Sequence, residues 1–270
     1  MSVITVSRGS FSGGKTLAEC LADRLGYRCV GRETVLERAA ASGVSLQDLL
    51  DALLKPPNFL DRFTHTRYQY LALFQAALAE EVQSGEVVYH GNAGHLMLKG
   101  AGAVLRVRIV APVEKRLAMV EERLNVRGKA ALDYLERVDE ERRKWTRYLY
   151  GVAWEDPVQY DVVYNLENVN TEQVCGSIVA LVRSCTCFKF TPECRAELEN
   201  LALASRIRAN VALNPTTSHL EIDVEAKAGQ VTIKGKVIGT GERDEVERVA
   251  RAVGGVRTVN LDALIPDTHL

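Results

Sequence analysis

The stretch GSFSGGKT, residues 9–16, decides the fold of this chain. It matches the phosphate-binding pattern G-x-x-x-x-G-K-[ST] at every fixed position. The β-branched run VITV, residues 3–6, precedes it, and an amphipathic pattern that ends at Gly26 follows it. The order strand, glycine loop and helix predicts a nucleotide-binding loop. The alternative is a glycine-rich turn that only lets a helix pack closely on a strand.

The residue types in this loop suit the binding of ATP and Mg²⁺. Glycines let the backbone curl so that successive N–H groups converge on phosphate oxygens, and the N-terminus of the following helix adds a positive dipole end. Lys15 is predicted to reach the β- and γ-phosphates as a point charge, and the Thr16 hydroxyl to coordinate Mg²⁺. The predicted nucleotide contacts are the whole loop: Gly9, Ser10, Phe11, Ser12, Gly13, Gly14, Lys15 and Thr16.

The composition is that of an ordinary globular protein with one or two domains. The 270 residues are 47% hydrophobic and 26% charged. Lys and Arg number 34 against 35 Asp and Glu, and the net charge of -1 gives no general attraction to nucleic acid or anionic lipid. The chain begins with a strand pattern, and it has no run of about 18 apolar residues. We therefore expect a cytoplasmic protein without a transmembrane segment.

Six cysteines are scattered along the chain. In a cytoplasmic protein free thiols are the default state, so no disulfide framework is predicted. Four of the cysteines could be drawn as a metal site, but they lack the paired C-x-x-C spacing that favours zinc: Cys175, Cys185, Cys187 and Cys194.

Strand-like runs alternate with long helical patterns after the glycine loop. Candidate strands are residues 2–7, 86–90, 104–110 and 161–164, with a further short one at 27–30. Pro112 precedes a helical pattern at 113–124, and an arginine-rich helical pattern follows Gly128. This alternation predicts an α/β fold, with a three-layer arrangement of a parallel sheet between helices.

A second, smaller organisation begins after a Cys/Thr/Phe/Pro stretch, and we place a linker at residues 184–199. The expected order is a helix at about 193–213, strands at 220–226 and 230–236, a helix at 242–253 and a strand at 257–264. A turn at Ala228-Gly229 joins the first two strands. These patterns predict a small α-β-β-α-β domain.

Residues 1–183 resemble the cytidylate-kinase-like family of nucleoside-monophosphate kinases. The segments that carry the likeness are ITVSRGSFSGGKTLAECLADRLGY (4–27), GRETV (31–35), VLRVRIVAPVEKRL (104–117), VDEERRKWTRYLYG (138–151) and DPVQYDVVYN (156–165). The resemblance implies phosphoryl transfer from ATP with Mg²⁺ to a nucleoside monophosphate, with CMP as the leading acceptor. It also implies a helical lid at residues 139–151 that closes over the phosphates.

Arginines suit such a lid, because guanidinium groups neutralise the charge on the migrating phosphoryl group without acting as acids or bases. The resemblance points to Arg142, Arg143 and Arg147 as catalytic residues and to Arg32 as a residue that faces the acceptor phosphate. The alternative is that the lid arginines form a solvated helix face with ion pairs four residues apart. Arg32 could likewise be a surface arginine at a helix start.

One departure from the family pattern affects the acceptor side. The family commonly has a glycine-arginine pair at the end of its third strand, whereas this chain has HGNAG at residues 90–94, so that Asn92 replaces the arginine and Ala93 follows. No carboxylate lies between Glu86 and Glu114. Asn92 is the candidate acceptor-binding residue here, whereas the nearby histidines are more typical of packing or capping. Two alternatives stay open, a catalytically impaired nucleotide sensor and a kinase of a non-nucleotide small molecule.

The C-terminal part, residues 200–270, resembles a BON domain through AGQVTIKGKV (228–237) and VGGVRTVNLDAL (253–264). The resemblance implies a small-molecule or lipid ligand and a regulatory role. The alternative is a domain that only packs on the kinase or forms a contact in a homo-oligomer. Residues 205–270 hold nine basic and nine acidic residues, so net charge gives no support for adhesion to an anionic membrane.

Overall fold

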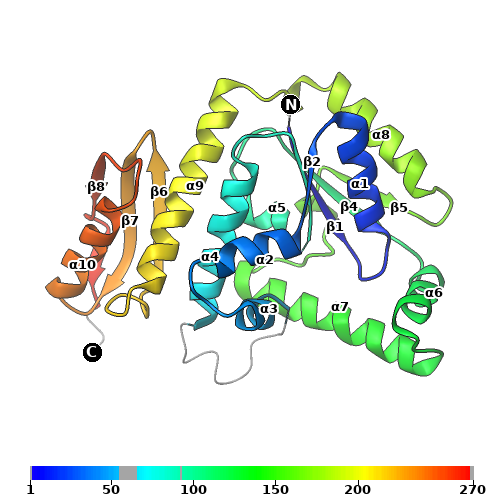
Figure 1. Ribbon diagram of the computed structural model, residues 1–270, viewed down its shortest axis with the longest axis horizontal. Helices are drawn as coiled ribbons and strands as arrows, with labels where there is room; N and C mark the ends of the chain where they lie inside the picture. Colours follow the sequence, from blue (N-terminus) through cyan, green and yellow to red (C-terminus); the bar gives the residue numbers. More distant parts are fainter. Residues whose placement is uncertain (1, 55–65, 92, 268–270) are drawn as a thin grey trace. The chain divides into compact units, whose positions relative to one another are not determined.

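The computed structural model describes residues 2–54, 66–91 and 93–267. They form two compact units (Figure 1). The N-terminal unit contains residues 2–34, 54, 85–91 and 93–191, and the C-terminal unit contains residues 35–53, 66–84 and 192–267. Residues 35–53 and 66–84, which lie between the second and third strands in the sequence, therefore belong with the C-terminal unit, a grouping that no local pattern in the sequence indicates.

A five-stranded parallel sheet forms the centre of the N-terminal unit. Its strand order is β2-β3-β1-β4-β5, and every neighbouring pair is parallel. This confirms the predicted α/β fold with a parallel sheet and flanking helices. The strands are β1 (Val3–Arg8), β2 (Arg28–Gly31), β3 (Val87–His90), β4 (Val104–Val110) and β5 (Val162–Asn165).

Helices α1 (Gly14–Leu25) and α8 (Thr171–Ser184) lie side by side on one face of this sheet (Figure 1). Their apolar residues share a core with Ile4 and Val6 of β1 and with the odd-numbered residues of β4. Because side chains alternate along a strand, Ser7 and Arg108 project from the opposite face. The remaining helices of the unit are α5 (Gly94–Met97), α6 (Val113–Leu124) and α7 (Lys129–Tyr150).

Helix α2 (Arg32–Ala40) leads from the N-terminal unit into the C-terminal one, where α3 (Leu46–Leu54) and α4 (Thr66–Val82) follow. The rest of the C-terminal unit is α9 (Pro192–Leu213), β6 (Ile222–Lys227), β7 (Gln230–Val237), α10 (Thr240–Arg251), β8 (Thr258–Asn260) and β9 (Leu264–Pro266). Strands β6 and β7 are antiparallel, and β8 and β9 both pair with β7 in parallel. Helix α9 packs on both β6 and α4.

The hairpin between β6 and β7 turns at Ala228 and Gly229, which have φ angles of 51° and 83°. Positive φ at both central residues is typical of the two-residue turns that match strand twist. The prediction of one continuous strand at 257–264 is wrong. The Asp262 N–H donates to the Asn260 side chain at 2.7 Å, and the Leu264 N–H donates to the Leu261 carbonyl at 2.9 Å. These two bonds form a turn that divides the segment into β8 and β9.

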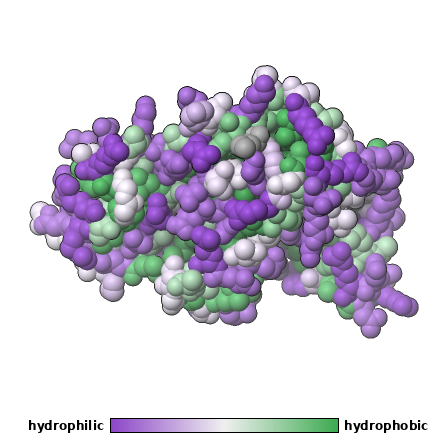
Figure 2. Space-filling model, turned by 45° about the horizontal axis from the view of Figure 1, so that its top comes forward, coloured by the Kyte–Doolittle hydropathy of each residue, from purple (hydrophilic) through white to green (hydrophobic). Residues whose placement is uncertain are grey.

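The face shown in Figure 2 carries hydrophilic side chains over much of its area, with hydrophobic groups between them. Within the described residues, none of the helices combines the length and the apolar character needed to cross a membrane.

Candidate active site

The glycine loop lies between β1 and α1, as its pattern predicts. Gly13 has a φ of 80°, in the left-handed region that side chains disfavour, and a Cβ atom on Gly14 would overlap the side chain of Arg8. The Ser12 hydroxyl donates to the Gly9 carbonyl at 2.8 Å and closes the loop. The Leu17 N–H donates to the Gly13 carbonyl at 3.1 Å, and the N–H groups that precede it have no acceptor within the helix. They are therefore suited to an anion.

An arginine from α6 and a carboxylate from α7 contact this loop. The Arg116 Nε donates to the Ser10 carbonyl at 2.8 Å, and the Arg116 guanidinium pairs with Asp139 at 2.5 Å. The Ser10 N–H lies 3.5 Å from the other Asp139 oxygen. The Ser10 hydroxyl is buried and has no hydrogen-bond partner among the described residues. The loop thus already holds one anionic group against its backbone.

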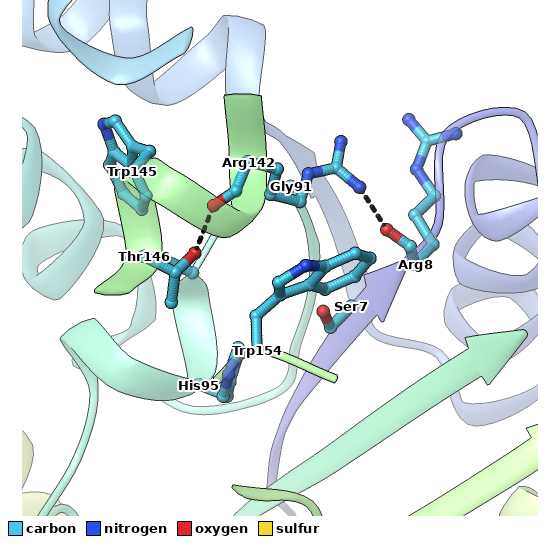
Figure 3. Close-up of a pocket in the computed structure, with 9 residues that line it drawn as sticks. Ser7, Arg8, Gly91, His95, Arg142, Trp145, Thr146 and Trp154 are labelled. Carbon is cyan, nitrogen blue, oxygen red and sulfur yellow. Dashed lines mark hydrogen bonds between the residues drawn. The ribbon is translucent and has the colours of Figure 1, made fainter. Parts of the chain in front are cut away.

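Arg142 of α7 reaches the end of β1. Its guanidinium donates to the Arg8 carbonyl at 2.5 Å, and Figure 3 shows it pointing across the pocket toward that carbonyl. Burial lowers the pKa of Arg142 to about 10, and the charges of Arg8, Arg32 and Arg116 add to this effect, against the attraction of Asp139. Burial and the charge of Arg32 also lower the pKa of Arg8. Several guanidinium groups therefore gather where parallel strands end, the edge at which α/β sheets bind ligands.

The arginines predicted as site residues fall into two groups, those that lie in or near the arginine cluster and those that are exposed on α7. Arg32 lies near the arginine cluster, where it pairs with Glu33 at 2.7 Å and leaves its buried Nε without a hydrogen bond among the described residues. Arg143 and Arg147 are exposed on α7. Arg143 pairs with Glu140 and, at 3.0 Å, with Glu155, as the alternative of a solvated helix face predicts.

The two remaining loop residues with predicted roles are exposed at the start of α1. The Lys15 ammonium lies 3.7 Å from the Glu19 carboxylate, and the Thr16 side chain is exposed. Asn92 lies outside the described residues, and its neighbour Ala93 lines the pocket with a φ of 52°. The roles assigned to these residues stay predictions.

A small pocket lies below Arg142, at the end of β1 and β3 (Figure 3). Its free volume is about 10 Å³, roughly the space of one water molecule. The residues that line it come from β1, the segment after β3, α7 and the segment after α7: Ser7, Arg8, Gly91, Ala93, His95, Arg142, Trp145, Thr146 and Trp154. Trp154 and His95 were not predicted as binding residues, because they come from separate segments that only the fold brings together.

The loop fits ATP and Mg²⁺ through its backbone and through the buried, unpaired Ser10 hydroxyl. The described residues contain no cluster of three His, Cys, Asp or Glu side chains that could hold a metal by themselves. Mg²⁺ usually keeps water and phosphate oxygens as ligands, so Thr16 together with a bound triphosphate would suffice. When bound, the ion would neutralise charge on the transferring phosphate.

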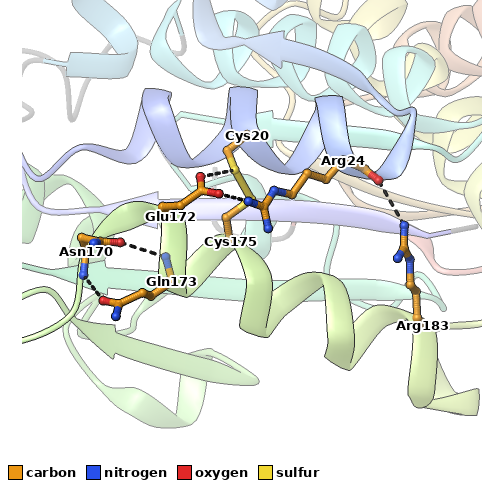
Figure 4. Close-up of a disulfide and its surroundings, with 7 residues drawn as sticks. All are labelled: Cys20, Arg24, Asn170, Glu172, Gln173, Cys175 and Arg183. Atoms are coloured by element: carbon orange, nitrogen blue, oxygen red, sulfur yellow. Dashed lines mark hydrogen bonds and ion pairs between the residues drawn. A yellow bond between two sulfur atoms is a disulfide. The ribbon is translucent and has the colours of Figure 1, made fainter.

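The expectation of free thiols throughout is wrong for four of the six cysteines. A disulfide joins Cys20 of α1 to Cys175 of α8 (Figure 4). Another joins Cys185 to Cys187. Three of the four cysteines considered for zinc are therefore disulfide-bonded. Cys29 and Cys194 belong to neither disulfide. Disulfides persist in oxidising environments, so the cytoplasmic location stays a prediction.

Polar contacts accompany the bond between α1 and α8 (Figure 4). Arg24 pairs with Glu172, and Arg183 donates to the Arg24 carbonyl at 3.2 Å. Asn170 and Gln173 form a capping box at the start of α8. The helix that begins at the glycine loop is thus fixed against its neighbour along its length.

Strand, glycine loop and helix in a parallel sheet, with an arginine-bearing helix over the strand ends, define a P-loop protein of the kinase type. Residues 3–168 match the model of the Cytidylate kinase-like family, and residues 200–264 match that of the BON domain. The chain belongs to the cytidylate kinase-like family and carries a C-terminal BON domain.

Two cytidylate kinases are similar to this chain over 181 residues. The one from Pyrococcus horikoshii is 26% identical, with 67% of this chain and 88% of the relative covered. The one from Thermococcus kodakarensis is also 26% identical, with 67% and 87% covered. The fold is similar to that of an uncharacterized protein from Eubacterium ventriosum, with a TM-score of 0.52 and 18% identity over 68% of this chain and 100% of that one.

Proposed function

We propose that this protein transfers a phosphoryl group from ATP, with Mg²⁺, to a nucleoside monophosphate, with CMP as the leading acceptor. The observation that carries the proposal is that Arg116 contacts the glycine loop and Arg142 contacts Arg8 at its start, with Arg32 near enough for its charge to act on Arg142. Phosphoryl transfer depends on positioning and on neutralisation of charge on the transferring oxygens, and such a cluster supplies both. Membership of a kinase family and the two similar cytidylate kinases support the same reaction.

In this proposal each residue binds or orients a phosphate. The backbone N–H groups of the loop would hold the donor phosphates, and Thr16 would hold Mg²⁺. Lys15 would turn from Glu19 to the β- and γ-phosphates, which costs little because an exposed pair four residues apart contributes only about 0.5 kcal/mol. Arg142 and Arg32 would face the acceptor phosphate, and Arg143 and Arg147 could join them only after the lid moves.

The sequence at the end of β3 favours a second candidate, a nucleotide sensor that has lost transfer activity. Asn92 and Ala93 stand where the family commonly has an arginine, so acceptor geometry is the function at risk. If that is the cause, Asn92→Arg should leave ATP affinity similar and raise or create transfer. A kinase of a non-nucleotide small molecule is the third candidate, and it would show ATP-dependent activity with none of the nucleotides.

We propose a regulatory or ligand-binding role for the BON domain. Its support is the packing within the C-terminal unit, where Tyr68 of α4 donates to the Ile222 carbonyl of β6. Gln69 donates to the Ser218 carbonyl at 2.9 Å. Because α4 belongs in sequence to the kinase family match, a ligand that shifts β6 or α9 would act directly on a kinase helix.

The test is an ADP-release assay with ATP and Mg²⁺ against CMP, dCMP, UMP, AMP and GMP, with a blank that lacks acceptor. We expect selective release with CMP that Lys15→Ala abolishes. ATP binding without any acceptor-stimulated release would refute the kinase proposal and favour the sensor or another acceptor.

A further inference from the structure

A polar cluster lies beneath the pocket on the face of the sheet that α1 and α8 do not cover. Ser7 of β1 and Arg108 of β4 are neighbours in the parallel register. The Ser7 hydroxyl lies 3.2 Å from the Tyr160 hydroxyl, which donates to the Trp154 carbonyl at 2.7 Å. Arg108 donates to the same carbonyl, and its guanidinium lies 4.4 Å from the centre of the Trp154 ring. Two side chains, Tyr160 and Arg108, therefore fix the backbone of Trp154, and Ser7 contacts the first of them.

Two guanidinium groups lie close to the indole ring of Trp154. Arg108 lies against one part of the ring, and the Arg142 guanidinium lies 5.0 Å from its centre. Arg142 belongs to the predicted lid, so it can leave the ring when the lid moves, whereas Arg108 belongs to a central strand. Figure 3 shows the Trp154 ring between the lid helix and Ser7. A flat aromatic surface thus closes the pocket beside the arginine cluster.

Two side chains that line the pocket have buried polar atoms without partners. His95 and Trp154 are each only 4% exposed. Both imidazole nitrogens of His95 and the Nε1 of Trp154 lack a hydrogen-bond partner among the described residues. Native proteins rarely leave such atoms unpaired, so they are satisfied by an ordered water or by a ligand that enters the pocket. A tilted contact with the Tyr160 ring, with ring centres 4.6 Å apart, orients the imidazole.

The unpaired atoms define the chemistry that the ligand must have. Burial, with the nearby charges of Arg106 and Arg108, lowers the pKa of His95 to about 4, so its imidazole is neutral at pH 7. A neutral imidazole offers one donor and one acceptor, and the indole offers one donor. The complementary group is uncharged and carries a carbonyl next to an N–H or amino group. The arginines on the other side of the pocket select an anion.

We propose that His95 and Trp154 determine acceptor specificity by binding the base of a pyrimidine nucleoside monophosphate whose phosphate faces Arg8 and Arg142. This inference rests on the function proposed above. A pyrimidine edge presents the required carbonyl and amino or imide groups within one small ring. The lining must separate to admit any nucleotide, and the smallest base requires the least displacement of Arg142, Trp145 and Thr146.

The chain itself supplies a probe of this pocket that does not require turnover. Its only two tryptophans, Trp145 and Trp154, both line the pocket. Titration of the full chain with CMP, UMP, AMP and GMP, followed by tryptophan fluorescence, should give a saturable change that is tighter for the pyrimidine nucleotides. Equal affinity for all four nucleotides would overturn the proposal.

Two variants remove the proposed base contacts while they keep an aromatic ring. His95→Phe removes the imidazole nitrogens, and Trp154→Phe removes the indole N–H. Each should weaken CMP binding by about 10-fold or more and reduce the preference for CMP over AMP, with ATP affinity unchanged. His219→Phe makes the same exchange as His95→Phe in the C-terminal unit and serves as the control. Thermal unfolding identifies a variant that fails to fold, and the other variant then decides.

The outcomes separate this inference from the proposed function. Pyrimidine-selective binding that depends on His95 and Trp154, but without phosphoryl transfer, would support the pocket and refute the kinase. Transfer with an unchanged base preference in both variants would support the kinase and refute the pocket. If no nucleoside monophosphate binds, both proposals fall.

Discussion

Lys15 is the residue on which the proposed reaction depends most directly, although its side chain now lies next to Glu19 at the surface. Lys15→Ala removes the point charge expected on the β- and γ-phosphates. We predict a loss of about 100-fold or more in kcat, the range found when one transition-state charge contact is removed. Steady-state ADP release measures it. Lys99→Ala, which removes an exposed lysine elsewhere in the N-terminal unit, is the control, and equal activity in both variants would refute the loop assignment.

His95 gives a prediction for stability as a function of pH. Its pKa is about 4 in the folded protein and 6.5 when exposed, so between these values the unfolded chain binds more protons. The contribution of His95 to stability is complete above pH 6.5 and is lost as the pH falls to 4, by about 3 kcal/mol in total. Urea unfolding of the wild type and of His95→Phe at pH 7, 5 and 4 measures it. Parallel pH dependence in the two proteins would contradict the buried, neutral imidazole.

The loop residues could be predicted as site residues because their pattern is contiguous. The places of Arg8, Arg116 and Trp154 in the site could not be predicted. The end of β1, helix α6 and the segment after α7 are far apart in sequence and meet only after the parallel strands align. The strand sequence VLRVRIV, residues 104–110, holds one signal that a buried arginine belongs to the site. Arg106 and Arg108 alternate within an apolar strand, so both side chains lie on one face of a buried sheet. A buried arginine requires partners, and here they are Trp154 and Tyr160.

At the level of elements, Asp139 holds α7 against the glycine loop through Ser10 and Arg116. The side chains of Asp139 and Arg116 are only 16% and 15% exposed, so loss of either partner leaves the other poorly solvated. Asp139→Ala should lower the free energy of local opening of α7 by about 1–3 kcal/mol, seen as faster amide hydrogen exchange in that helix. Asp133→Ala on the same helix removes only an exposed pair with Lys129 and should change little. Identical exchange in both variants would show that Asp139 does not dock α7 on the glycine loop.

Periodicity predicted most elements closely but could not place every boundary. The predicted bounds of two elements, 104–110 and 113–124, are identical to those of β4 and α6. An apolar run and a helix that begins after a proline are strong local signals. The break between β8 and β9 depends on a side-chain turn at Asn260, which a short apolar alternation hides. Helix α4 is buried on nearly all sides, so it has no single apolar stripe to indicate a partner. That partner is α9, more than a hundred residues away.

For the whole molecule, the order of a kinase part and a BON domain was readable from sequence, and the family matches confirm it. The compact units do not follow that order, because residues 35–53 and 66–84 pack with residues 192–267. Domain boundaries inferred from composition mark where a pattern changes, whereas compact units depend on which apolar surfaces meet. The long α9 has two packing partners within the C-terminal unit, the BON sheet and the kinase helix α4. This arrangement is the physical reason to propose coupling between ligand binding at the BON domain and the acceptor side.

The bond between Cys20 and Cys175 should determine how stable the N-terminal unit is, because it joins α1 to α8 across a sequence separation of 155 residues. Closing so long a loop restricts the unfolded chain, and we expect dithiothreitol to lower the free energy of unfolding by about 2–5 kcal/mol. Both tryptophans lie in this unit, so their fluorescence follows its unfolding in urea. Cys20→Ser should have the same free energy of unfolding as the reduced wild type, and dithiothreitol should not change it. The second disulfide closes only a two-residue separation, and its reduction in Cys20→Ser should have little effect. A wild-type curve that dithiothreitol leaves unchanged would mean that Cys20 and Cys175 are thiols in solution.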